Sequence, residues 1–297
     1  MVRSRKRRST GQIVLVVCLA LLSLAMFYPI YNQLVISLTG PEYIAAANGT
    51  TIIPRGFTLN TYISVLSIPK VYRGVLNSMF ITAVGLVVNI VLTSMGAYVL
   101  TKRDLVGRNF FMTLIVITMI FEGGLIPDYF LMRDLHLLNR YASVIMYKAV
   151  NPYYLIILMR FFDKVPKSLM ESARLDGCSD MRILFKIVIP ISISGIATIS
   201  LFYGVFHWNE YFRAMIYLTD EVKYPLQVVL RELIVSMEKA SFVGANNYIQ
   251  SATTAAALDF KAIKAALIII AIVPILVFYP FVLRYYVKGR LQGAIKE

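Results

Sequence analysis

Six long apolar stretches constrain this 297-residue sequence more than any other feature. A helix rises about 1.5 Å per residue, so crossing a hydrocarbon layer about 30 Å thick takes about 20 mainly apolar residues. Only 15% of the residues are charged, against about 25% in soluble domains. The sequence therefore predicts an all-α membrane protein with six transmembrane helices. They are expected at Ile13–Leu38, Leu76–Leu100, Phe110–Phe130, Ala142–Phe162, Ile187–Tyr211 and Ala262–Tyr286.

Two of these stretches are interrupted. Glu122 and the pair Gly123-Gly124 lie inside the third, and Asn151-Pro152 lies inside the fourth. Glycine and proline are tolerated in spanning helices where neighbouring groups satisfy the freed backbone. Both stretches are therefore retained as predicted spans.

A basic N-terminal segment precedes the first stretch. Such a start is also found in signal peptides, but this apolar run exceeds the usual length of about 7–15 residues and no small-x-small cleavage site follows it. We expect an uncleaved span, a cytoplasmic tail over residues 1–12 and one transmembrane domain over 13–297. More than half of the 30 lysines and arginines fall in or beside the segments that this topology places inside. The positive-inside rule thus predicts that both termini are cytoplasmic.

The cytoplasmic segment 163–190 carries the most specific motif. Glu-Ser-Ala is followed after three residues by glycine and, nine residues later, by Ile-Val-Ile-Pro. This spacing resembles the EAA motif of ATP-binding-cassette (ABC) importer permeases, in which Glu-Ala-Ala and glycine precede Ile-x-Leu-Pro. Ser172 replaces an alanine and Ile189 replaces the leucine. The candidate coupling residues are Glu171, Ser172, Ala173, Asp176, Gly177, Ile187 and Pro190.

The resemblance implies a type I importer permease fold whose segment 163–190 docks on a separate ATPase. Glu171 is expected to contact a basic residue of that ATPase, Ala173 to permit close packing, and Gly177 to form the turn. Leu169 is expected to cluster with Ala173 and the apolar pair Ile183-Leu184. The alternative is an amphipathic linker at the membrane surface without a partner.

Other positions resemble the carbohydrate-uptake branch of these permeases, including its maltose-type and polysaccharide-permease members. They are Pro127, Leu137-Leu138-Asn139, Phe161-Phe162-Asp163, Pro166, Trp208-Asn209-Glu210 and the ending Pro280, Val287-Lys288-Gly289, Gly293. The resemblance implies a bacterial inner-membrane protein that imports a sugar or oligosaccharide. Its implied partners are a homologous second permease, two ATPase subunits, an extracytoplasmic sugar-binding protein and membrane lipid.

Polar and aromatic residues in the apolar stretches are candidates for a translocation path. A carboxylate inside a span is costly, so Glu122 is expected to face protein or water, or else to mark an early end of the third span. The other candidates are more commonly interhelical hydrogen-bonding residues, and Trp208 is alternatively an interfacial anchor. These candidates are Asn89, Ser94, Asn151, Tyr203, His207, Trp208 and Asn209.

Several functional classes find no support in the sequence. It contains no G-x-x-x-x-G-K-[ST] phosphate loop, so ATP and Mg²⁺ are expected on the partner ATPase and no cofactor on this chain. There is no catalytic constellation, metal-ligand spacing or nucleic-acid motif, and Cys18 and Cys178 are not expected to pair. An ABC permease for phosphate, polyamine or peptide and an autonomous secondary transporter remain as alternatives.

Overall fold

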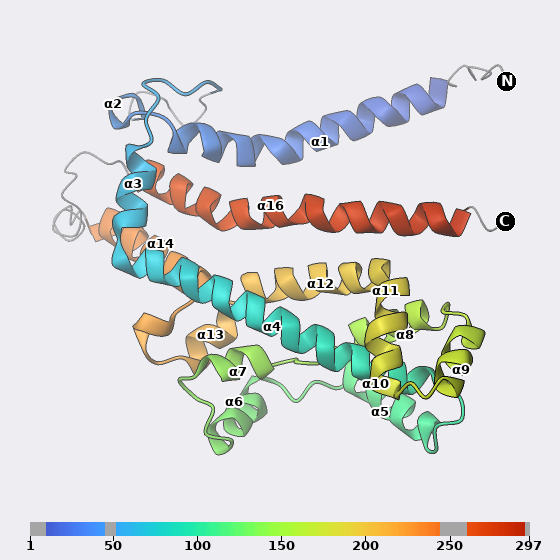
Figure 1. Ribbon diagram of the computed structural model, residues 1–297. Coiled ribbons are helices and arrows are strands. Elements are labelled where there is room, and N and C mark those ends of the chain that lie inside the picture. Colours follow the sequence, from blue (N-terminus) through green and yellow to red (C-terminus); the bar gives the residue numbers. More distant parts are fainter. Residues whose placement is uncertain (1–9, 45–51, 244–259, 295–297) are drawn as a thin grey trace. The chain divides into compact units, whose positions relative to one another are not determined.

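The computed structural model describes residues 10–44, 52–243 and 260–294, and all regular structure in these ranges is helical (Figure 1). The predicted all-α class is thereby confirmed. The basic tail at residues 1–9 lies outside the described residues. The elements are α1 (Thr10–Ser37), α2 (Pro41–Ile44), α3 (Asn60–Ser67), α4 (Pro69–Thr101), α5 (Arg108–Ile120), α6 (Leu125–Asp134), α7 (Tyr141–Met146), α8 (Pro152–Phe162), α9 (Lys167–Leu175), α10 (Asp180–Ile183), η1 (Leu184–Val188), α11 (Ile189–Ile191), α12 (Ile193–Trp208), α13 (Phe212–Tyr217), η2 (Glu221–Lys223), α14 (Leu226–Val243) and α16 (Phe260–Ala294).

Membrane-spanning length is reached in several of these helices. Among the described residues, Gly11–Ser37, Pro69–Thr101 and Phe260–Pro280 are each long and apolar enough to cross a bilayer. Two bent pairs bring the number to five: α5 with α6, at 118°, and the α10–α11 segment with α12, at 88°. The fourth predicted stretch is divided into α7 and α8, with residues 147–151 between them. The structure therefore shows three to five candidate spans, where six were predicted.

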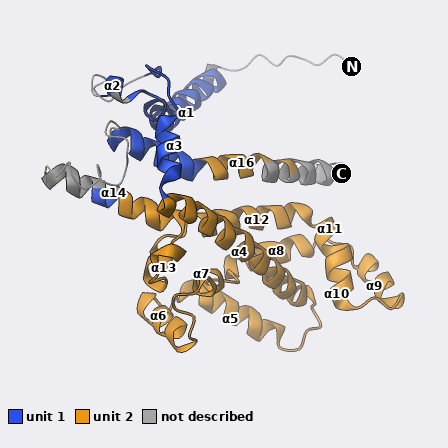
Figure 2. Cartoon of the chain, turned by 60° about the vertical axis from the view of Figure 1, so that its left-hand side comes forward, with its two compact units in different colours: residues 1–68, 234–272 blue, residues 69–233, 273–297 orange. Residues whose placement is uncertain are grey.

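The chain forms two compact units (Figure 2), one of residues 1–68 and 234–272, the other of 69–233 and 273–297. In the first, α1 exposes apolar side chains from Ile13 to Phe27. Its C-terminal end is tied to α3 by a 2.6 Å hydrogen bond between the Ser37 and Tyr62 hydroxyls. An apolar helix exposed around its whole circumference is suited to lipid rather than to water.

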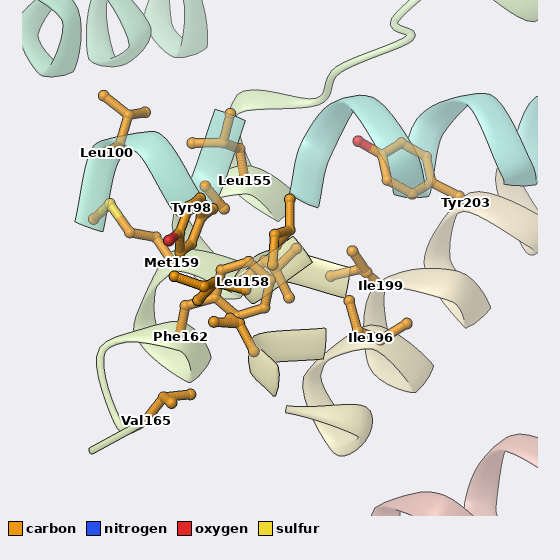
Figure 3. Close-up of a cluster of buried hydrophobic side chains, with 14 of the residues drawn as sticks. Tyr98, Leu100, Leu155, Leu158, Met159, Phe162, Val165, Ile196, Ile199 and Tyr203 are labelled. Carbon is orange, nitrogen blue, oxygen red and sulfur yellow. The ribbon is translucent and has the colours of Figure 1, made fainter. Parts of the chain in front are cut away.

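The second unit is built on α4, which packs against α12, α8 and α7. Its core is a cluster of side chains from α4, α8, α9, α10, η1 and α12 (Figure 3). Leu158, Ile183 and Ile199 in this cluster are fully buried. The segment 163–190 and the membrane helices thus share one core, so that movement of one disturbs the packing of the other.

Candidate functional site

The predicted turn at Gly177 is a regular helix-termination motif. Gly177 has φ +78°, its N–H donates to the Arg174 carbonyl at 3.0 Å, and the Cys178 N–H donates to the Ala173 carbonyl at 2.9 Å. These two bonds form the Schellman motif, which favours glycine because left-handed backbone is costly for residues with a Cβ. Gly177 therefore fixes where α9 ends and where the chain turns toward α10.

Residues 163–190, called the coupling segment below after their predicted role, have one buried side and one exposed side. Ala173 is 8% exposed and packs in the same core cluster as Ile183 and Leu184, as the sequence predicted. Leu169 does not join them, because its side chain is 45% exposed; that part of the prediction is wrong. Glu171, Ser172 and Asp176 are exposed as well. Within the described chain Glu171 forms no ion pair, and it is therefore available to a partner.

The second half of the segment departs from a straight α-helix at two places, a π-helical turn and a bend. Ile187 lies in the π-helical turn Leu184–Val188, and Pro190 lies in α11 directly after it. Proline has no N–H and its ring crowds the carbonyl four residues earlier, here that of Lys186 inside the π turn. The axis then bends by 88° at Ser192 before α12 begins. Pro190 thus acts on the π turn that precedes it, and the bend at Ser192 follows as a second joint between the coupling segment and α12.

Asp180 joins the coupling segment to α4, a contact that sequence analysis missed. Its carboxylate accepts hydrogen bonds from Lys102 Nζ at 2.7 Å, the Tyr98 hydroxyl at 3.0 Å and an Arg174 guanidinium nitrogen at 3.4 Å. Burial disfavours the charged form of Arg174, but bonds to Tyr98 and Asp180 outweigh it and raise the Arg174 pKa. Three donors on one carboxylate form a network, which holds geometry better than an isolated surface pair.

Loss of this carboxylate is expected to loosen the coupling segment. Replacing Asp180 with alanine should speed trypsin cleavage after Arg174 severalfold in inside-out vesicles, because local opening admits the protease. Lys102→Arg keeps the charge and should leave the cleavage rate near that of the wild type. An unchanged rate in Asp180→Ala would show that core packing alone holds the segment.

The translocation-path candidates fall into two groups, of which the first is buried. The Asn89 amide donates to the carbonyls of Lys148, at 3.3 Å, and Ala149, at 2.7 Å, while its oxygen lies 2.5 Å from His207 Nε2. The Tyr203 hydroxyl lies 2.8 Å from Thr93 Oγ1 and accepts the Asn151 N–H, also at 2.8 Å. Asn89, Tyr203 and His207 are each at most 1% exposed. Their bonds tie α4, α12 and residues 147–151 together, which favours the interhelical alternative for these three.

Three further candidates, on α4 and at the C-terminal end of α12, belong to neither group. Ser94 on α4 is fully buried, and Trp208 is 5% exposed and borders an apolar cavity of about 360 Å³ with Met79 and Phe278. The side-chain amide of Asn209 is exposed and donates to the Val205 carbonyl at 2.9 Å. None of these three lines the polar cavity described next.

The second group, Glu122 and Asn151, opens onto a cavity of about 680 Å³. This polar cavity lies between the C-terminal end of α5 and the N-terminal end of α8. Glu122 pairs with Lys148 at 2.7 Å. The Asn151 side chain caps α8 by accepting the Tyr153 N–H at 3.0 Å. The polar and aromatic residues that line the cavity are Thr118, Phe121, Glu122, Asp128, Tyr147, Lys148, Asn151 and Tyr153.

Comparison with known proteins identifies the family of the chain. Residues 78–291 match the family described as "Binding-protein-dependent transport system inner membrane component". The chain belongs to this family. The prediction of an ABC importer permease, drawn from the motif over residues 171–190, is confirmed, as is a multi-pass location in the inner membrane.

Two relatives and one solved structure place this permease more closely. It is 41% identical to a polygalacturonan/rhamnogalacturonan transport system permease protein of Bacillus subtilis, over 82% of this chain and 84% of the relative. It is 28% identical to an arabinooligosaccharides transport system permease protein of Halalkalibacterium halodurans, over 98% and 99%. A chain of a bacterial ABC transporter involved in the import of alginate, an acidic polysaccharide, superposes with a TM-score of 0.83 and 32% identity. That match covers 96% of this chain and 99% of the other. The predicted resemblance to carbohydrate-uptake permeases is thereby confirmed.

Proposed function

We propose that this permease forms one half of the membrane pathway of an importer for sugars, oligosaccharides or polysaccharide fragments. The observation that carries the proposal is the coupling segment: its buried side shares a core with the membrane helices, while Glu171 on the other side is free for a partner. The names of the relatives support carbohydrate as the cargo. A non-sugar solute is the alternative within the same family, whereas membership of that family speaks against an autonomous secondary transporter.

The proposed topology has six spans and two cytoplasmic ends. It counts α5 with α6, α7 with α8, and the α10–α11 segment with α12 as one broken span each. The distribution of basic residues supports this orientation. Residues 163–190 then lie at the inner face, where an ATPase can reach Glu171.

The mechanism follows from coupling between two states. A sugar-binding protein delivers cargo at the outer face, and two ATPase subunits, which hold ATP and Mg²⁺, close at the inner face. Closure moves the exposed side of α9, and the shared core carries that movement to α4 and α12. The permease has two arrangements, and both partners bind the same one more tightly. Their binding therefore shifts the population toward that arrangement and changes the side on which the pathway opens. A second, homologous permease supplies the other half of the pathway.

Purification of the tagged chain from native membranes tests the assembly, with co-purifying proteins identified by mass spectrometry. We expect an ATPase, a second permease and a sugar-type binding protein. Proteoliposomes containing that complex should take up an oligosaccharide only when ATP is supplied. Recovery of the chain alone, under conditions that preserve a known transporter complex, would contradict the proposal, as would uptake without ATP.

A further inference from the structure

The polar cavity lies where two half-length helices end. Helix α5 has 13 residues and α8 has 11, which correspond to about 20 Å and about 16 Å, each shorter than a bilayer core of about 30 Å. The two helices pack together, and the non-helical residues 121–124 and 147–151 follow and precede them. Non-helical backbone at membrane depth is tolerated where it is buried in protein or lines a water-filled cavity. The volume, about 680 Å³, is within the range of about 300–1,000 Å³ that small-molecule sites occupy.

The lining of the cavity combines exposed aromatic faces with paired polar groups. Phe121 is 73% exposed and Tyr153 is 56% exposed, so both rings are accessible. Tyr147 is only 7% exposed, and the Arg213 guanidinium lies 3.7 Å from the centre of its ring. An aromatic face is negatively polarised and attracts the C–H bonds on the face of a sugar ring. Carboxylate oxygens and an ammonium group at the rim match the donors and acceptors of its hydroxyls.

The charge of the lining distinguishes between kinds of sugar. Glu122 and Asp128 supply two carboxylates, and Lys148 supplies one ammonium group that Glu122 already holds at 2.7 Å. The other nearby cation, Arg213, stacks on Tyr147 and lies 4.0 Å from the Glu210 carboxylate. Among the described residues Asp128 has no ion-pair partner. A sugar carboxylate entering the cavity would displace Glu122 from Lys148 and face Asp128, and both changes are unfavourable. Uncharged hydroxyls meet neither obstacle.

We propose that this cavity is a subsite for an uncharged sugar ring, which stacks on Tyr153 and bonds through its hydroxyls to Glu122, Lys148 and Asp128. The inference rests on the proposed function and adds to it the place where the cargo binds and a preference for sugar rings without charge. This subunit contacts the cargo, and it does so through a neutral ring.

Protection of an introduced cysteine tests the subsite in the complete transporter. In a chain with Cys18→Ser and Cys178→Ser, Met146→Cys places a thiol in the cavity lining, outside the proposed sugar contacts. We expect at least one of galactotriose, arabinotriose and maltotriose to slow its reaction with a maleimide at least threefold, and to do so at lower concentration than trigalacturonate. Val106→Cys, in a position 91% exposed in the predicted inner loop, should react at an unchanged rate.

Variants of the stacking residue sharpen the test. Tyr153→Ala should remove the protection and Tyr153→Phe should retain it, because only the ring face is required. Stronger protection by trigalacturonate than by every neutral probe would overturn the charge preference. ATP-driven uptake of the same probes is measured in parallel. Uptake of a probe without protection would refute the subsite and leave the proposed function standing, whereas failure of all the probes in both assays would count against both.

Discussion

Replacing Gly177 with proline is expected to abolish ATP-driven uptake while the chain still inserts in the membrane and assembles. Proline fixes φ near −65°, whereas Gly177 requires +78°, and it removes the N–H that donates to Arg174. The end of α9 then cannot form, and Glu171 on that helix loses its orientation toward the ATPase. The measurement is uptake per ATP hydrolysed in proteoliposomes, with an expected decrease of more than tenfold.

The matched control is Gly177→Asn. No atom lies within 4 Å of a Cβ built at this position, so the only cost is backbone strain, which asparagine tolerates better than other residues. Asparagine should therefore retain most of the uptake. Glu171→Ala removes the proposed ionic contact but keeps the turn, and should also uncouple hydrolysis from uptake. Normal uptake by both Gly177→Pro and Glu171→Ala would eliminate this segment as the coupling element.

A large effect on stability is expected from a substitution at Gly85 on α4. A Cβ there would lie 2.5 to 2.8 Å from the ring atoms of His207. That ring has no freedom to move, because it is 1% exposed and is held by Asn89. Overpacking of this kind costs about 1–3 kcal/mol. Gly85→Ala should therefore lower the temperature at which the detergent-solubilised protein loses its monodisperse peak in size-exclusion chromatography.

Gly204→Ala on α12 makes the same chemical change as a control. Its added Cβ would lie 3.8 Å from Phe278, an ordinary contact, and alanine favours a helix over glycine by about 0.5–1 kcal/mol. The melting temperature should thus stay constant or rise. In the double variant Gly85→Ala/His207→Ala the clash is absent, and its destabilisation should be less than the sum of the two single effects. Strict additivity would refute the steric explanation.

The helix interruptions at Gly123-Gly124 and Asn151-Pro152 were predictable from sequence, because those residues act through local backbone geometry. The bend at Ser192 was not predictable, because the stretch Ile187–Tyr211 is apolar throughout and was therefore assigned to a single helix. The turn at Gly177 was predictable for the same local reason as the first two.

Contacts between distant parts of the chain were beyond sequence analysis. Lys102 and Asp180 are 78 residues apart, and neither stands in a motif that points to the other. The inward direction of Asn89 and His207 was hidden as well, because a helix that is apolar around its whole circumference has no periodicity to mark its packed face. Such pairs can be recognised only once α4 and α12 have been placed side by side.

The short lengths of α5 and α8 have a mechanical consequence. In the proposed topology these two helices cover only about 16–20 Å of a hydrocarbon layer that is about 30 Å thick. A solute that reaches their outer ends has already passed a third or more of the insulating layer. The protein therefore has to move only a thin layer of residues to change the side on which the pathway opens. A displacement of the size of one side chain opens a larger fraction of the barrier here than it would across a full-length helix.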